Sequence, residues 1–221
     1  MTLGGKGSRP QLIDLGAARW VVFGFAVVVF VVAILAPYTS LIGVSLIKSV
    51  GLSFWENVTL QHYRFVLFQY DVTQRAIFNS LILSAAAATL AVIIGAVIGW
   101  IDLRSTIWGR KTLDYVSLIP LGLPGIVMAV ALIQFWLRTP FPLYGTLAIL
   151  LLAYTARYIP LGVRAANASL RQVDGSLEES ARILGASWGM TMRHVTLPLI
   201  RPGLMAGWLL VFVPAIQELS A

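Results

Sequence analysis

The chain of 221 residues contains no cysteine, only 9 acidic residues and only 2 histidines. Without cysteine there is no disulfide framework, no thiolate metal site and no cysteine nucleophile. Charged residues make up 11% of the sequence, whereas soluble domains carry about a quarter. So few charges cannot cover a water-soluble surface. The composition therefore excludes a disordered chain, a collagen-like chain and a soluble enzyme.

Sequence motifs for nucleotide and metal binding are also absent. The only Gly-Lys pair is Gly5-Lys6, and Gly7 follows it in place of the Ser or Thr of a phosphate-binding loop. No H-E-x-x-H pattern occurs, and the two histidines, His62 and His194, belong to loops predicted on opposite faces of the protein. We therefore expect no cofactor, no metal site and no ATP hydrolysis by this chain.

Apolar residues dominate what is present, at 58% of the sequence with a mean hydropathy of +0.85. A helix needs about 20 apolar residues to cross the roughly 30 Å of hydrocarbon in a membrane. Five runs reach about this length, at residues 21–47, 77–101, 115–137, 143–163 and 202–221. These runs predict an all-α, polytopic membrane bundle with five spans.

The basic residues lie mostly on one side of these runs, which sets an orientation by the positive-inside rule. With residues 1–20 in the cytoplasm, the loop 48–76 is periplasmic and the loop 164–200 is cytoplasmic. The inner set is Lys6, Arg9, Arg19, Arg104, Arg110, Lys111, Arg157, Arg164, Arg171, Arg182, Arg193 and Arg201, and the outer set is Lys48, Arg64, Arg75 and Arg138. Topology thus explains the net charge of +7, and no nucleic-acid partner is required.

Individual runs carry further signals. The run 77–101 is rich in Ala, Gly and Ser, which lets helices pack closely in lipid. Pro120 and Pro124 predict a kink in the third run, whose freed carbonyls meet neighbouring helices or a cavity. Arg157 is placed near the cytoplasmic end of the fourth run.

One enzyme motif matches by letters only. Residues 185–189 read Gly-Ala-Ser-Trp-Gly, the G-x-S-x-G pattern of the serine-hydrolase nucleophile elbow. That elbow needs a strand before the serine and a buried helix after it. A charged, helix-forming segment precedes it here, so the pattern does not indicate a hydrolase.

The segment 176–198, SLEESARILGASWGMTMRHVTLP, is the most informative part of the chain. Ser176 and Glu179 match a capping box, which predicts a helix that starts at Ser176. Gly185 fits the left-handed residue that ends a helix, and a second short helix is expected to stop at Pro198. The predicted apolar face consists of Leu177, Ala181, Leu184 and Trp188, with Glu178, Glu179 and Arg182 pointing elsewhere. By itself the pattern also fits an interfacial helix without a partner, or a helix packed on its own bundle.

This segment resembles the EAA motif of the inner-membrane permeases of binding-protein-dependent ABC importers. The motif reads E-A-A, three residues, G, nine residues and I-x-L-P. The matching residues are Glu179-Ser180-Ala181, Gly185 and Val195-Thr196-Leu197-Pro198, with Ser180 for Ala and Val195 for Ile as the departures. The resemblance covers about residues 79–221, and Asn79-Ser80-Leu81 is similar to the usual start of the family's domain.

The resemblance implies a MetI-like permease fold with six spans, so that one span is missing from this chain. The sequence leaves open whether Met1 and Ala221 are the natural ends of the protein. It implies an ABC ATPase subunit, a periplasmic solute-binding protein and a second permease half or copy as partners, in the lipid of a bacterial inner (plasma) membrane. Movement of the loop by the ATPase would rock the spans between two access states. The residues implied in ATPase coupling are Leu177, Glu178, Glu179, Ala181, Leu184, Gly185, Leu197 and Pro198.

A finer resemblance points to a solute. Residues 212–220 are similar to the fifth-span region of ferric-iron permeases, and residues 4–16 are similar to the linker between the two halves of fused members. This implies that the chain is most of a second half and that it transports ferric iron delivered by a binding protein. Gln217 and Glu218 are then hypothesised to line the translocation path, because a carboxylate in hydrocarbon costs about 2.5–3.5 kcal/mol and is usually paired or functional. The alternative places Glu218 in water at the outer interface.

A second function stays open at this stage. A channel or membrane scaffold would also have apolar spans and an amphipathic cytoplasmic docking loop. Copurification distinguishes the two, because only a permease is expected to bring down an ATPase subunit.

The predicted orientation can be tested with single cysteines at Ser8 and Gln61, since the natural chain has none to remove. An impermeant maleimide should label the cysteine at position 61 in intact cells and the cysteine at position 8 only after the membrane is opened. Labelling at position 8 in intact cells would contradict the orientation.

Overall fold

The computed structural model describes residues 15–49, 57–140 and 143–218. The similarities noted for residues 4–14 and 219–220 lie outside the described residues. Most described residues are helical, and the β contact among them is an isolated bridge between Ile47 and Val58. The predicted all-α class is therefore confirmed.

Contacts within the chain divide it into two units, residues 1–73 and residues 74–221. The first unit contains α1 (Ala18–Phe30), the π-helical turn η1 (Val31–Leu35) and α2 (Ala36–Ser45), which form one helix of 28 residues. None of these residues is buried within the protein. The helix continues past Pro37, and η1 lies just before this proline, where the missing N–H interrupts the hydrogen-bond ladder.

The predicted loop 48–76 is partly helical. It includes α3 (Gln61–Arg64) and the π-helical η3 (Phe65–Gln69). Its last residues belong to the next long helix, which already begins at Asp71. Hydropathy missed this start because Asp71 and Arg75 are charged.

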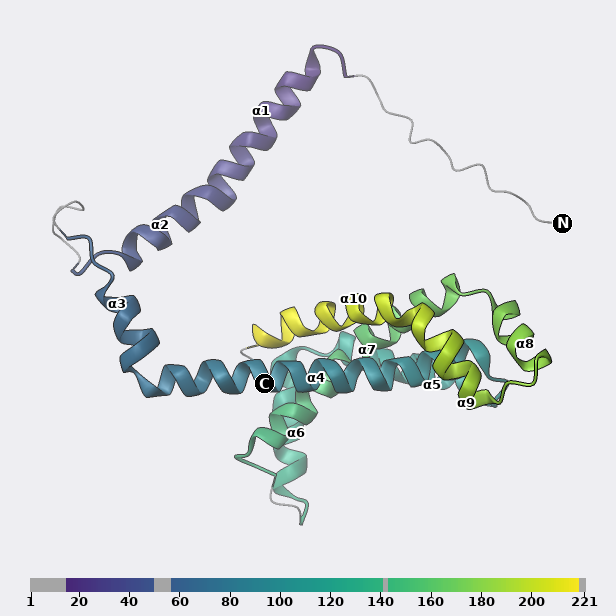
Figure 1. Cartoon of the computed structure of the whole chain (residues 1–221). Helices are drawn as coiled ribbons and strands as arrows, with labels where there is room; N and C mark the ends of the chain where they lie inside the picture. Colours follow the sequence, from purple (N-terminus) through teal and green to yellow (C-terminus); the bar gives the residue numbers. More distant parts are fainter. Residues whose placement is uncertain (1–14, 50–56, 141–142, 219–221) are drawn as a thin grey trace. The chain divides into compact units, whose positions relative to one another are not determined.

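The second unit is built around three long helices, α4 (Asp71–Arg104), α7 (Leu147–Gln172) and α10 (Leu197–Ile216), which run side by side in Figure 1. Their shared core is made largely of small and aliphatic side chains. It comprises Leu83, Ala87, Ala88, Ala91 and Val92 of α4, Tyr154 and Tyr158 of α7, and Val211 and Ala215 of α10.

Glycines allow the backbones of these helices to approach closely. A side chain at Gly95 of α4 would overlap the backbone of Gly162 of α7, and a side chain at Gly207 of α10 would overlap Ala165 of α7. The predicted close packing of the run 77–101 is thereby confirmed. Between helices in lipid the hydrophobic effect gives no net attraction. Close contacts such as these stabilise the bundle through dispersion instead.

The third apolar run forms two helical parts with a sharp bend between them. α5 (Arg110–Leu118) with η4 (Ile119–Gly122), and α6 (Gly125–Leu137), meet at 107°. At the break Leu123 is extended (φ −97°, ψ 128°), because a residue before proline avoids the helical region and Pro124 follows. The kink predicted in this run is therefore confirmed, and the two parts count as one span if they cross the membrane together.

Two other boundaries also differ from the prediction. α7 continues past residue 163 to Gln172, and the last apolar helix extends back without a break to Trp188. The predicted loop 164–200 is thereby reduced to residues 173–187. Arg157 lies near the middle of α7 and not near its end.

By length and composition, the described residues contain four helices able to cross a membrane, or five if the bent pair is one span. The prediction of five spans matches the second count. The fifth span is then the α5–α6 pair.

Candidate functional site

The short segment between α7 and α10 forms a helical hairpin, seen at one end of the bundle in Figure 1. It consists of α8 (Gly175–Ile183), α9 (Trp188–Thr191) and the π-helical η5 (Met192–Thr196), which continues into α10. The motif that resembles EAA therefore lies on a connection between two long helices, as expected.

Asp174 caps the start of α8. Its Oδ1 accepts a hydrogen bond from the backbone N–H of Ser176 at 3.0 Å. This bond lowers the pKa of the exposed Asp174 carboxyl below its ordinary value, so the cap is complete above the ordinary pKa and is lost as pH falls through the lowered one. The predicted capping box of Ser176 and Glu179 is wrong, because Asp174 supplies the acceptor and the helix starts at Gly175.

Gly185 ends α8 in the left-handed conformation, with φ +88°. Its N–H donates to Arg182 O at 2.9 Å, and the N–H of Ala186 donates to Ala181 O at 3.0 Å. These two bonds are the pair that defines a Schellman motif, which satisfies the last carbonyls of the helix. The sequence prediction for Gly185 is confirmed.

Ser187 has a structural role and is not part of a nucleophile elbow. Its Oγ accepts from the N–H of Met190 at 3.4 Å at the start of α9. The described residues before it are helical, so the strand required by the hydrolase motif is missing from this part of the chain.

The residues of the apolar face predicted for this segment are exposed or half-buried in the structure. Glu178, which was predicted to lie off the apolar face, is 6% exposed and is the one buried residue of this helix. The apolar residues Ile183 and Leu184 are 85% and 88% exposed, and Leu177 is also exposed. Glu179 is exposed and Ala181 is half-buried. The outer surface of the hairpin is thus apolar at its tip.

The end of the motif lies in the first turn of α10. Leu197 and Pro198 are exposed and border an open groove together with Arg201 and Leu204. In the sequence, α9 and η5 lie between the tip of α8 and these two residues of α10.

Glu178 is held by two other elements. Its Oε1 lies 3.4 Å from Arg104 Nε at the end of α4 and accepts a hydrogen bond of 3.0 Å from the Thr196 hydroxyl. Sequence analysis did not find these partners. Arg104 was assigned only a topological role, and no sequence spacing relates it to Glu178.

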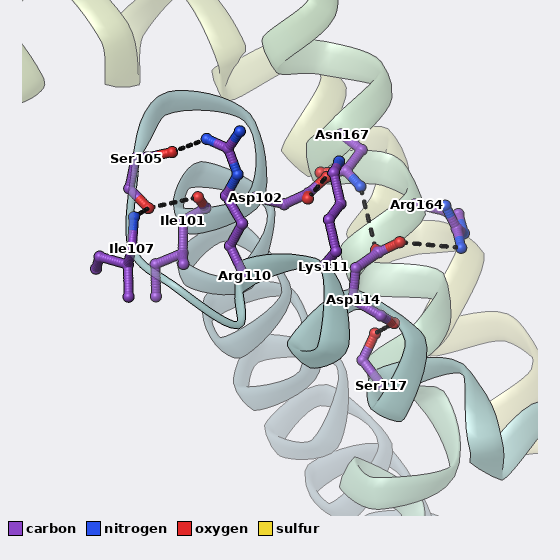
Figure 2. Close-up of polar contacts among 10 residues, drawn as sticks. All are labelled: Ile101, Asp102, Ser105, Ile107, Arg110, Lys111, Asp114, Ser117, Arg164 and Asn167. Carbon is purple, nitrogen blue, oxygen red and sulfur yellow. Dashed lines mark hydrogen bonds and ion pairs between the residues drawn. The ribbon is translucent and has the colours of Figure 1, made fainter.

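A second polar network holds α5 against α4 and α7 (Figure 2). Lys111 Nζ of α5 lies 2.7 Å from Oδ1 of Asp102, a buried residue in the last turn of α4. Asp114 of α5 lies 3.7 Å from Arg164 Nη2 and accepts a bond of 3.5 Å from Asn167 Nδ2, both on α7. These contacts hold the C-terminal half of α7, which contains Arg164 and Asn167, against α5.

Glu218 also faces protein, as predicted. Its Oε2 lies 3.0 Å from Arg157 Nε and accepts a hydrogen bond of 2.7 Å from the Tyr158 hydroxyl. The Tyr154 hydroxyl donates to the Glu218 carbonyl at 3.3 Å. Sequence analysis did not pair Arg157 with Glu218, although each is the single charged residue of an apolar run. Gln217, by contrast, is exposed and caps the end of α10.

No group of three or more His, Cys, Asp or Glu residues that could hold a metal ion occurs among the residues that the structure describes. The side chain of His194 contacts the Met190 carbonyl at 3.1 Å. The candidate site is therefore defined by contacts between helices and not by a set of metal ligands.

Residues 91–221 match the family described as the inner membrane component of binding-protein-dependent transport systems. This match includes α7, the hairpin and α10. The chain belongs to this family. With its apolar helices, it is a multi-pass inner-membrane protein, and its relatives are named as transport system permease proteins.

The chain is 29% identical to the ferric transport system permease protein of Actinobacillus pleuropneumoniae, over 100% of this chain and 32% of that protein. It is 30% identical to a putative ferric transport system permease protein of Haemophilus influenzae, over 100% of this chain and 35% of that protein. The molybdenum transport system permease protein of Escherichia coli is 33% identical, over 68% of this chain and 71% of that protein. The chain thus spans about a third of the length of the ferric permeases it matches.

The ion pair between Arg157 and Glu218 allows a stability test. Removing one partner of a buried pair leaves an uncompensated charge and costs about 3–5 kcal/mol, whereas replacing both partners is far less costly. We expect Arg157→Gln to lower the apparent melting temperature in detergent more than Glu218→Gln does, because the Glu218 side chain is 9% exposed and that of Arg157 is 27% exposed. The double variant should melt above Arg157→Gln. Additive losses in the double variant would contradict a direct pairing.

Proposed function

We propose that this chain forms part of the membrane pathway of an ABC importer and couples to a separate ATPase through the α8 hairpin. The observation that carries the proposal is the exposed tip of α8. Ile183 and Leu184 are almost fully exposed at a turn defined by Gly185, on the connection that matches the family. Exposed apolar side chains at a defined turn suit the docking of a protein groove.

The remaining partners follow from the family description and not from contacts in this chain. A binding-protein-dependent system needs a solute-binding protein outside the membrane, and a second permease half or copy is the other partner in this proposal. In this proposal residues 1–20 and the α8 hairpin face the cytoplasm, and lipid surrounds the outer faces of the helices. The chain itself hydrolyses nothing.

Coupling through the hairpin can be tested at Gly185. A side chain there meets open space, but φ is +88°, so a β-branched residue strains the turn by about 1–3 kcal/mol without creating a clash. We expect Gly185→Val to be present in the membrane at normal levels, to copurify with less ATPase subunit and to transport no solute. The measurements are quantitative immunoblotting, affinity copurification and uptake.

Two control variants isolate the turn. Gly189→Val adds the same side chain into open space at a glycine without positive φ and should leave uptake unchanged. Gly185→Asn should restore much of it, because asparagine tolerates the left-handed region. Full transport and full ATPase copurification in both Gly185→Val and Glu179→Ala would exclude the hairpin as the coupling element. Copurification of another cytoplasmic protein with wild type, and no ATPase, would favour the channel or scaffold alternative.

The proposed translocation path includes Gln217 and Glu218. Supporting this, a pocket between the long helices is bordered by Asn79 and Ser80 of α4, Tyr154 of α7 and Glu218. Polar side chains that border a hollow within an apolar bundle are the usual marks of a solute pathway. Glu218 is there balanced by Arg157, so the pocket carries no uncompensated charge.

We propose ferric iron, delivered by a binding protein, as the solute. The support is the similarity of residues 212–220 to ferric permeases and the two ferric transport relatives that align over the full chain. Other relatives carry the names of molybdenum and trehalose systems, so the family alone does not decide the solute.

Deletion of the gene in cells that lack other iron importers should reduce growth on limiting ferric iron and reduce uptake of radioactive ferric iron. The purified chain should bind no free ferric iron tightly, because the described residues offer no cluster of metal ligands. Unchanged iron-limited growth after deletion would contradict the assignment and leave the permease proposal intact.

A further inference from the structure

The α8 hairpin is joined to the bundle by charge, whereas its apolar residues face outward. Glu178 is the one buried residue of α8, and Ile183 and Leu184 point away from the bundle. A surface helix ordinarily buries an apolar stripe and exposes its charges. The reversal needs an explanation, because a buried carboxylate costs free energy unless it is both paired and hydrogen-bonded.

Arg104 of α4 supplies the opposite charge for Glu178 and also caps the end of α7. Its Nε lies 3.4 Å from Glu178 Oε1, and its Nη2 donates to the carbonyls of Leu170 and Val173 at 3.1 and 2.6 Å. Both carbonyls lie at the C-terminal end of α7, where carbonyls carry partial negative charge, and the Leu170 carbonyl also accepts from the N–H of Val173 at 3.3 Å. One guanidinium therefore joins the ends of α4 and α7 to α8.

Thr196 connects the same carboxylate to α10. Its hydroxyl donates to Glu178 Oε1 at 3.0 Å, and the residue is 1% exposed. Thr196 ends η5 and immediately precedes the first residue of α10. Near the other end of the hairpin, the ring of Trp188 packs edge-on against Trp100 of α4, with centroids 5.5 Å apart.

The neighbouring acid on α4 does not compete for Arg104. Asp102 is paired with Lys111 of α5 at 2.7 Å. The last turn of α4 thus carries two separate ion pairs, one toward α5 and one toward α8.

We propose that Glu178 is a positioning residue that clamps α8 to the ends of α4, α7 and α10 through Arg104 and Thr196. The ion pair to Arg104 and the hydrogen bond from Thr196 restrict the sliding of α8 over the bundle, and Arg104 extends this hold to the end of α7. A displacement imposed on the exposed tip is then passed to all three helices together. This role rests on the proposed function, since the displacement comes from a docked ATPase, but the clamp itself does not require the ATPase.

The clamp is tested first on the purified chain in lipid nanodiscs, without an ATPase, by amide hydrogen exchange of α8. Glu178→Leu removes both polar contacts, and Glu178→Gln removes the charge and keeps an acceptor for Thr196. We expect exchange in α8 to be about tenfold faster or more in Glu178→Leu, because an anchored helix opens less often than a loosely held one, and intermediate in Glu178→Gln. Glu179→Gln, which neutralises the exposed neighbouring glutamate, should match wild type in this measurement.

A double-variant cycle tests the pairing with Arg104. Arg104→Gln should accelerate α8 exchange, and the double variant with Glu178→Gln should be less affected than the sum of the single variants, because each removes the same contact. Exchange rates in Glu178→Leu equal to those of wild type, or strictly additive effects in the cycle, would overturn the clamp.

The consequence for coupling is measured with the assembled transporter. We expect Glu178→Gln to retain ATPase copurification and to transport about tenfold less solute per ATP hydrolysed, because the anchor loses its charge but the docking tip is unchanged. A loss of ATPase copurification in proportion to the loss of transport would show that Glu178 serves docking only, and would overturn the positioning role. Failure of the proposed function is seen separately, as the absence of any ATPase subunit with the wild-type chain.

Discussion

The constraint on which this structure depends is the free-energy cost of a charged side chain inside an apolar helical bundle. The chain meets it by pairing acids with bases from different helices. Asp102 of α4 pairs with α5, Asp114 of α5 pairs with α7, Glu178 of α8 pairs with α4, and Glu218 beyond α10 pairs with α7. Because each pair joins two elements, the few charges of the second unit also determine which helix ends lie together.

Close backbone contact completes this arrangement. Apolar side chains gain little from leaving lipid for protein, so the long helices are held by packing at small residues and by polar contacts. Glycines at positions 95, 162 and 207 bring α7 against α4 and α10, and the ion pairs lie at the helix ends and along α7. The α8 hairpin has no such backbone contact. It depends on Glu178, its capping residues and one aromatic pair, and therefore joins the bundle through few but directional interactions.

Much of the fold could be predicted because its signals are local. Long apolar runs predicted helices, Pro124 predicted a break, and Gly185 predicted the end of α8. The errors came from side chains whose partners are distant in sequence. Hydropathy ended the fourth run at about residue 163, whereas helix α7 continues to Gln172 and its Arg164 and Asn167 contact Asp114 of α5. In the same way, periodicity placed Glu178 off the apolar face but did not reveal its burial, because its partners Arg104 and Thr196 are distant in sequence.

The sequence by itself determined that the protein is an all-α membrane chain, that it has neither a nucleotide-binding loop nor a cysteine, and that the segment 176–198 resembles a coupling motif. These properties depend on composition, length and short spacings, which are complete in the one-dimensional chain. Only the tertiary structure decided which of two adjacent glutamates is buried, that α5 and α6 meet at 107°, and that Arg157 and Glu218 form a pair. Those outcomes depend on which helix ends come together, because the cost of burying a charge is settled by the nearest opposite charge in space and not by its neighbours in sequence.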